Sequence, residues 1–401
     1  MIEAAAAELA VGIENYGTSG EPCRGRAKSI ADDFRVEEVM STDGLSTERK
    51  PGYFPLYKVE KRSIDTMHMA REMSVDLKSR VSYGGLKDSK AAAVQYVTPT
   101  STRSAVPANV VRDRFSATLI GYIPRPLSRA SVLGNRFEVI LRECCEDVGS
   151  RVTEAMECAK GGRVPNYYGH QRFGVNGPGT HRIGKAIVRR EFEAAVKVLL
   201  EGCADGSPLP RGKDVESMVV RELERHPGEW VRALRAVPLR LRRLYVQAYQ
   251  SFVFNRTLSR AMAKGLDISA VQEGDNWAEA SEDGLLISKA RGVREKPTGD
   301  AVPMVQIVGY AHRDYGSRFD SCLTEVLESE GVSASQFYVQ EMQEVSCEGA
   351  FRRPHLAVAD ASWSIDEGAV SLKFTLSRGE YATVLLREIL KPRDPAQAGL
   401  A

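Results

Sequence analysis

The sequence lacks a hydrophobic segment long enough to cross a bilayer, which needs roughly 20 apolar residues. The alanine run at Ala4–Ala7 is flanked by Glu3 and Glu8 and follows no basic residue, so it does not predict a signal peptide. An excess of one charge is also lacking, because 55 basic and 53 acidic residues leave a formal net charge of +2. We therefore expect no membrane partner, and any nucleic-acid site must be a local basic patch.

Patterns of metal ligands and paired cysteines are missing too. The six histidines show no His-x-x-x-His spacing, and none of the seven cysteines forms a Cys-x-x-Cys pair. The cysteine number is odd and the chain is large, which favours reduced thiols in a cytoplasmic protein over a disulfide framework. We therefore expect no bound metal ion.

The composition that remains is typical of a globular protein, with 43% hydrophobic and 27% charged residues. The length predicts two or three domain-sized units. Alternation of apolar and polar residues predicts strands at 34–39, 53–61, 81–83, 94–98, 115–123, 137–141, 285–287, 302–308 and 369–376, with Pro55 favouring a sheet edge for the second. Helical periodicity and capping residues predict helices after Asp65 and at 147–160, 187–201, 214–225, 240–264, 320–328 and 380–390.

The stretch Ser82–Thr98 has the strongest chemical signal. Two glycines permit a tight turn, and Lys87 and Asp88 follow directly. An isolated Asp has a pKa of about 3.9, and neighbouring cations lower it further, so Asp88 should stay ionised. Such a carboxylate suits a nucleophile or a base. It also suits the N-cap of a helix that starts at Ser89.

This stretch resembles the signature of the TruD family of tRNA pseudouridine synthases, a Gly-x-Lys-Asp turn followed by an Ala and a Gln. The matching residues here are Gly85, Lys87, Asp88, Ala91 or Ala92, and Gln95. A second stretch, 164–174, resembles the family's Pro-Asn-Tyr-Phe-Gly-x-Gln-Arg-Phe-Gly. Weaker similarity extends from Lys28 to Lys391.

The resemblance implies an α+β fold, in which helices flank a mixed, largely antiparallel sheet. It also implies a discontinuous catalytic domain formed by residues 1–176 and 349–401. An inserted, mainly helical α+β domain, the TRUD domain, would occupy residues 177–348. The length of this insertion is closer to archaeal members of the family than to bacterial ones.

The activity implied by the resemblance is the isomerisation of uridine to pseudouridine in tRNA, usually at position 13. The reaction has no redox step, so we expect no cofactor, and we expect a monomer with tRNA as its partner. The target uridine must leave its stack, which costs a few kcal/mol. One ionised carboxylate then attacks ribose C1′ or removes a proton from C2′, and the sequence does not choose between these routes.

The resemblance also assigns the candidate site residues. Asp88 is the catalytic carboxylate, and Lys28, six residues before Phe34, matches a family lysine and is expected to keep Asp88 charged. Lys87 is adjacent, but successive side chains often point apart. Tyr168 replaces the bacterial Phe and is expected to stack on the flipped base, at roughly 1–3 kcal/mol; core packing is its alternative.

Three further residues have open roles. Asn166 either holds the Asp88 turn or makes a local Asx-turn. Arg172 either binds a phosphate or braces its loop against a carboxylate. Phe34 either lines the pocket or packs in the core.

Two basic clusters are weak phosphate-binding signals, and solvated helix faces explain them equally well. The first surrounds Trp230, and the second follows the motif at 164–174. Their members are Arg232, Arg235, Arg240, Arg242 and Arg243 in the first, and Arg182, Lys185, Arg189 and Arg190 in the second.

Two other functions remain open. One is a non-catalytic structured-RNA-binding protein or RNA chaperone that keeps the pocket without the chemistry. The other is a hydrolase of glycosidic bonds, which normally requires a second carboxylic acid. Glu37, Glu38 and Glu60 offer no convincing partner for that role.

Overall fold

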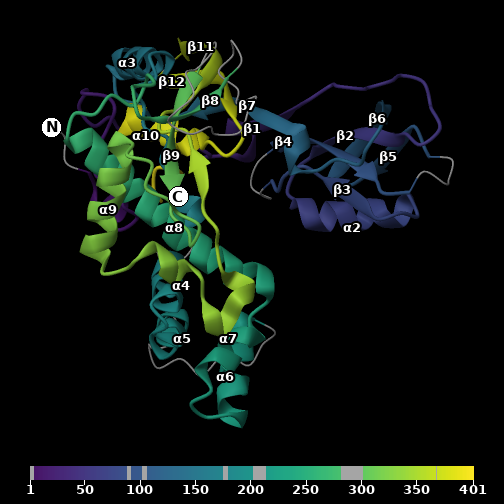
Figure 1. Ribbon diagram of the computed structural model, residues 1–401. Coiled ribbons are helices and arrows are strands. Elements are labelled where there is room, and N and C mark those ends of the chain that lie inside the picture. Colours follow the sequence, from purple (N-terminus) through teal and green to yellow (C-terminus); the bar gives the residue numbers. More distant parts are fainter. Residues whose placement is uncertain are drawn as a thin grey trace.

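The computed structural model describes residues 4–87, 92–101, 106–174, 179–201, 214–280, 301–366 and 368–401. Within these residues a nine-stranded sheet runs in the order β11-β12-β7-β1-β4-β2-β6-β5, and β3 pairs with β4 (Figure 1). Its pairings are antiparallel except for β1 with β4, so the sheet is mixed and largely antiparallel, as expected. The strands are β1 (Phe34–Met40), β2 (Phe54–Lys61), β3 (Val81–Tyr83), β4 (Ala92–Pro99), β5 (Asn109–Arg112), β6 (Phe115–Ile123), β7 (Val132–Leu141), β11 (Val358–Asp366) and β12 (Ala369–Ser377).

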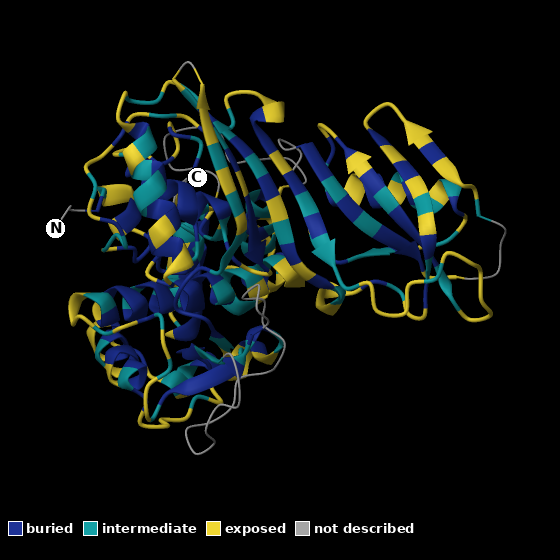
Figure 2. Cartoon of the chain, turned by 90° about the horizontal axis from the view of Figure 1, so that it is seen from above, coloured by how far each residue is buried: buried dark blue, intermediate teal, exposed yellow. Residues whose placement is uncertain are grey.

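The parallel β1–β4 pairing joins two halves of this sheet, each covered by its own helices on one face. Helix α2 (Thr66–Asp76) shares a core with β2, β4 and β6. Helices α3 (Val148–Lys160) and α10 (Ala382–Leu390) share a second core with β1, β7 and β12. Figure 2 shows buried and exposed residues alternating along the strands, so one face of the sheet is buried and the other is exposed.

The middle of the chain is mainly helical and has a core of its own. Its long helix α8 contributes Tyr249 and Val253 to this core and Phe254 and Leu258 to the core under β1, so α8 joins the two. No helix in the described ranges is both long and apolar enough to span a membrane. The elements are α4 (Thr180–Val188), α5 (Phe192–Leu200), α6 (Val215–Arg225), α7 (Trp230–Ala236), α8 (Leu239–Ala263), β8 (Asn276–Glu279), β9 (Ala301–Ile307), α9 (Arg318–Glu330) and β10 (Ala350–Arg352), and a short α1 (Ala6–Leu9) starts the described chain.

Most predicted elements are confirmed within two residues at each end, but two predictions are wrong. The helix expected at 187–201 is interrupted, because Arg190 has a left-handed φ of 59° between α4 and α5. Strand β2 lies between β4 and β6 and not at an edge. Pro55 is tolerated there because pairing with β4 begins only at Tyr57. The strand predicted at 285–287 lies outside the described residues.

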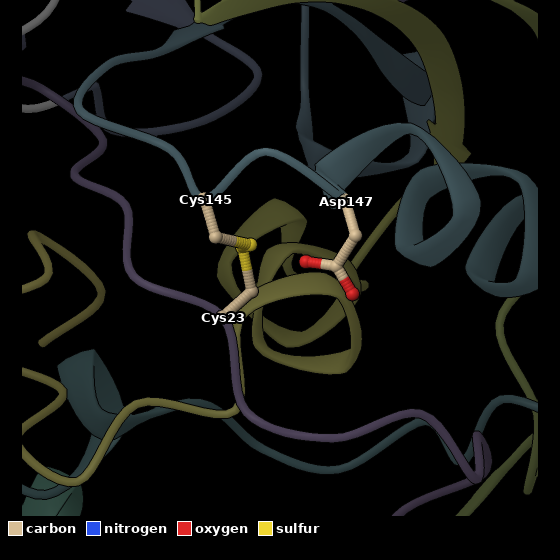
Figure 3. Close-up of side chains that lie close together, drawn as sticks. All are labelled: Cys23, Cys145 and Asp147. Carbon is tan, nitrogen blue, oxygen red and sulfur yellow. A yellow bond between two sulfur atoms is a disulfide. The ribbon is translucent and has the colours of Figure 1, made fainter.

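The expectation of reduced thiols throughout is also wrong. Cys23 and Cys145 form a disulfide with an S–S distance of 2.01 Å, and Asp147 lies beside it (Figure 3). The two cysteines are 122 residues apart, and the backbone pairing of Arg26 with Arg142 brings their segments together. Potential ligand atoms of the three residues lie within 4.8 Å of one another. Since both sulfurs are engaged in the S–S bond, neither is a thiolate ligand.

Candidate active site

The backbone that leads to Asp88 is held on the side of α2. The Lys87 N–H donates to Thr66 Oγ1 at 2.8 Å, and Lys61 Nζ donates to the Lys87 carbonyl at 3.2 Å. Thr66 Oγ1 in turn donates to Gln95 Oε1 at 2.8 Å, which ties the same point to β4. Asp88 itself lies outside the described residues. The backbone of its chain neighbour Lys87 is therefore held directly from α2 and β2, and through Thr66 from β4.

The side chain of Lys87 extends the other way, towards β1 and β7. Its Nζ donates to Asn135 Oδ1 and lies 3.5 Å from Glu38 Oε1. Glu38 is buried, and its other carboxylate oxygen accepts from the Tyr96 N–H at 3.1 Å. Burial raises the pKa of Glu38, and the Lys87 ammonium opposes that rise. Lys87 thus bridges the two halves of the sheet where they meet.

Lys28 and Phe34 lie together at the start of β1. Lys28 Nζ is 4.8 Å from the centre of the Phe34 ring, within the range of a cation–π contact. Phe34 is buried and meets Phe137 edge to face, with ring centres 5.8 Å apart. Phe34 therefore packs in the core, one of the two roles considered for it, and its ring also contacts the Lys28 ammonium.

Tyr168 is fixed at its backbone by α8 and at its ring by Arg352. Asn255 Oδ1 accepts from the Tyr168 N–H at 2.8 Å, and Asn255 Nδ2 donates to the Tyr168 carbonyl at 3.0 Å. The Arg352 guanidinium lies 4.2 Å from the ring centre, and Phe254 and Tyr381 meet the ring edge to face. The side chain is half-buried, so the ring combines a held position with partial exposure.

Asn166 shares Arg352 with Tyr168. Arg352 Nε donates to the Asn166 carbonyl at 3.1 Å, and Arg352 Nη2 donates to Asn166 Oδ1. Asn166 Nδ2 donates to the Arg353 carbonyl at 3.1 Å, and Arg352 Nη1 donates to the Gly379 carbonyl at 2.8 Å. Both ends of the Asn166 amide thus bond to the segment around β10, and Asp88 lies outside the described residues.

Arg172 braces its loop through neutral partners. Its Nε donates to Ser251 Oγ and its Nη2 to Gln247 Oε1, both at 3.2 Å and both on α8. Its guanidinium carbon lies 5.9 Å from the Tyr168 ring centre. The brace that we considered is present, but amide and hydroxyl oxygens of α8 take the place of the expected carboxylate.

The two basic clusters are largely occupied by ion pairs. Glu344 pairs with Arg235 and Arg242, and Glu222 pairs with Arg232. In the second cluster each cation has an acidic partner: Arg182 with Glu201, Lys185 with Glu330, Arg189 with Glu191 and Arg190 with Glu341. These cations therefore stabilise the helical part of the chain, and Arg240 is the cluster member that reaches towards α2.

The candidate residues thus form two groups, Lys28 with Phe34, and Asn166 with Tyr168 and Arg172. Both groups belong to one hydrophobic core, because Phe34 is part of it and Tyr168 packs against it. Sequence reasoning missed Arg352, which holds Asn166 and Tyr168. It also missed the contacts of Glu38 and Asn135 with the Lys87 side chain.

A family model described as tRNA pseudouridine synthase D (TruD) matches residues 10–209 and 204–389. The "Probable tRNA pseudouridine synthase D" of Pyrobaculum neutrophilum is 32% identical over 436 aligned residues, which cover all of both chains. The protein of the same name from Methanopyrus kandleri is 32% identical over 84% of this chain and 86% of its own. The crystal structure of a Methanosarcina mazei protein assigned to tRNA pseudouridine synthase D superposes with a TM-score of 0.79, at 26% identity, over 99% of this chain and 100% of that one.

Proposed function

Because the chain belongs to the TruD family of tRNA pseudouridine synthases, we propose that it isomerises uridine to pseudouridine in tRNA, at position 13. The observation that carries the proposal is the fixed backbone of Lys87, one residue before Asp88 and inside the region that matches the family. We infer that this held backbone sets the position of the Asp88 carboxylate, which chemistry on a flipped nucleoside requires.

The reaction rearranges bonds within one nucleoside. The bond from uracil N1 to ribose C1′ breaks, the base turns, and a bond from C5 to C1′ forms. The proton on C5 leaves to solvent and N1 gains one, so atoms and electrons balance without a redox partner. Asp88 acts on the ribose, either as the nucleophile at C1′ or as the base at C2′, and no cofactor takes part.

Lys28 is the cation that we assign to Asp88. Its ammonium lies at the start of β1, against the Phe34 ring. A nearby cation favours the ionised form of a carboxylate and holds its pKa low. We assign Phe34 to the wall of the same pocket, where its ring limits how far the Lys28 side chain can move.

Tyr168 stacks on the flipped uracil in this proposal. Arg352 lies over the ring, and we place the base on the face opposite Arg352. Stacking on an aromatic side chain offsets part of the cost of flipping the nucleotide. Bacterial members of the family carry Phe at this position. The hydroxyl of Tyr168 adds a hydrogen-bond donor at the edge of the base.

Asn166 and Arg172 support this ring and its loop. Asn166 receives Arg352 and so fixes the cation behind the Tyr168 ring, in addition to the role at the Asp88 turn that the family resemblance implies. Arg172 anchors the loop to α8. We assign both to substrate positioning and neither to proton transfer.

The domain boundaries that we propose also follow from the family resemblance. We propose a catalytic domain of residues 1–176 and 349–401, interrupted by an inserted TRUD domain of residues 177–348. The helical core around α4, α5 and α7 is distinct from the cores under the sheet, which supports an inserted unit, and α8 connects it to the core under β1. We also propose that the protein acts as a monomer in the cytoplasm, where unmodified tRNA is available.

The direct test uses unmodified tRNA that carries tritium at uracil C5. Incubation with the wild-type protein should release tritium to solvent while the RNA chain and the number of bases stay intact. Asp88→Asn should release none, because an amide is neither a nucleophile nor a base here. The same variant should bind tRNA with the affinity of the wild type.

The alternatives give different results in this assay. A non-catalytic RNA-binding protein or chaperone would bind the tRNA and release no tritium even as wild type. A glycosidic hydrolase would release free uracil. Either result would reject the proposed isomerase.

A further inference from the structure

A hollow of about 600 Å³ lies between α2 and β3. We call it the α2–β3 groove. Six of the residues that line it supply its polar and flexible surface: Met67, Arg71 and Ser74 from α2, and Arg80, Ser82 and Tyr83 from β3 and its approach. Among the described residues that line the groove there is no carboxylate.

The acidic side chains of α2 are occupied on another side of the helix. Arg112 Nε donates to Asp76 Oδ2 at 3.2 Å, and Arg114 Nη2 lies 3.3 Å from Glu72 Oε1. Both arginines flank the turn between β5 and β6. The carboxylates of α2 are therefore neutralised there and do not compensate charge in the groove.

Arg71 and Arg80 lack such partners. Both are exposed, and neither side chain forms an ion pair or hydrogen bond within the described part of the chain. Arg71 shares a helical face with Met67 and Ser74, because residues three and four apart lie on one side of a helix. Two uncompensated guanidinium groups thus face one hollow, which gives it a positive potential.

The inserted part of the chain adds a third cation at the edge of this groove. Arg240 Nη1 lies 3.3 Å from Met67 Sδ, so the first turn of α8 meets the first turn of α2. Its neighbours in the basic cluster, Arg235 and Arg242, are held by Glu344. Arg240 has no carboxylate partner among the described residues.

Strand β3, which forms one wall of the groove, pairs with the same edge of β4 as β1, the strand that follows Lys28. Val97 of β4 pairs with Tyr57 of β2 on one edge and with Tyr83 of β3 on the other. Strand β1 pairs with β4 on that second edge as well, so β3 continues the line of β1. From Tyr83 the chain passes through two glycines to Lys87 and Asp88.

We infer that the α2–β3 groove binds the RNA phosphate backbone next to the nucleotide that is flipped towards Asp88. Arg71, Arg80 and Arg240 each contact a phosphate, and guanidinium groups suit this role because they present several donors in a fixed plane. One RNA strand then lies between α2 of the catalytic domain and the start of α8 in the inserted domain. The inference rests on the proposed function for the identity of the RNA.

The test measures binding to unmodified tRNA by filter retention between 50 and 200 mM salt, which does not depend on catalysis. Each phosphate contact that is lost should lower the slope of log affinity against log salt by roughly 0.7–0.9. We expect the slope to decrease by about 1.5 in the double variant Arg71→Gln with Arg80→Gln. In Arg240→Gln it should decrease by roughly 0.7–0.9. Affinity at a fixed salt concentration should fall roughly tenfold per arginine.

Two matched variants control for charge and folding. Arg112→Gln also removes one exposed positive charge near α2, but Arg112 is held in an ion pair with Asp76 and does not line the groove. The slope and affinity of this variant should match the wild type. Arg71→Lys with Arg80→Lys keeps the charge and should keep the slope. The inference is overturned if the Arg71 and Arg80 glutamine variant has the slope of the wild type, or if Arg112→Gln lowers it equally.

The tritium assay separates this inference from the proposed function. Lowered slopes without tritium release would leave the groove as an RNA site and reject the isomerase. Tritium release with unchanged slopes would keep the isomerase and reject the groove.

Discussion

Lys87 Nζ lies 3.5 Å from Glu38 Oε1, with the two side chains only 11% and 1% exposed. This pair lies where the sheet halves join, since Glu38 belongs to β1 and Lys87 follows β3. The backbone of the same lysine is bonded to Thr66 at the start of α2. Both halves of the sheet therefore hold Lys87, the residue directly before Asp88.

Glu38→Gln is expected to lower kcat by about 10- to 100-fold, because charged hydrogen bonds contribute roughly 1.5–3 kcal/mol and the amide leaves Lys87 uncompensated. KM should change by less than about twofold, because a buried Glu38 side chain is not available for direct contact with RNA. Single-turnover tritium release measures the chemical step. Glu60→Gln, which changes an exposed carboxylate on β2, serves as the control. A variant as fast as the wild type would mean that Glu38 has no part in positioning.

The strand pattern of β1 contained the signal for Glu38. Phe34, Val36 and Glu38 occupy the same face in an alternating strand, and the first two are buried. A carboxylate at an inward position predicts a buried partner, but the sequence does not tell which cation comes from elsewhere in the chain. That partner is fixed by the β1–β4 pairing, which joins segments more than 50 residues apart.

Arg352 illustrates the same limit over a longer distance. The motif at 164–174 indicated Tyr168 and Asn166, but the guanidinium that holds both comes from β10. Local pattern predicts elements and caps, such as the Asp65 cap of α2, because the interactions are local. Contacts between distant segments, including the Cys23–Cys145 disulfide, follow from the tertiary fold and have no local signature.

Tyr168→Leu is expected to reduce kcat/KM by about 5- to 150-fold, since stacking of a base on an aromatic ring contributes roughly 1–3 kcal/mol. Tyr168→Phe keeps the ring and is the matched control, with kcat/KM within about threefold of the wild type. Steady-state tritium release on unmodified tRNA measures both. Equal activity of the Leu and Phe variants would contradict the stacking role of Tyr168.

Reduction of the Cys23–Cys145 disulfide is expected to lower the free energy of unfolding by about 2–5 kcal/mol, because the bond closes a loop across a separation of 122 residues. Urea unfolding with and without dithiothreitol measures the difference. A variant with Cys23→Ser and Cys145→Ser should show the lower stability in both conditions and no further effect of the reductant. An unfolding midpoint of the wild type that does not respond to dithiothreitol would contradict the prediction.

Acid should destabilise the fold through buried His355. Burial lowers the pKa of His355 from 6.5 to about 4, with Arg353 adding to the effect, although its hydrogen bond to the Ile268 carbonyl acts in the opposite direction. The unfolded chain then binds a proton below pH 6.5 that the folded chain rejects, so stability is lost as the pH falls towards 4. Between pH 7.5 and 5 this corresponds to about 2 kcal/mol for His355. His181, whose pKa burial also lowers to about 4, adds a contribution of the same sign.

Urea unfolding of His355→Gln at pH 7.5 and 5 isolates the share of His355. The lost hydrogen bond of the imidazole lowers stability at both pH values and cancels in the difference between them. The variant should lose about 2 kcal/mol less than the wild type over this interval and should keep the part due to His181. His68→Gln, which changes an exposed histidine beside Asp65, is the matched control and should lose as much as the wild type. An equal loss in wild type and His355→Gln would show that His355 takes up its proton in the folded state, which its burial beside Arg353 opposes.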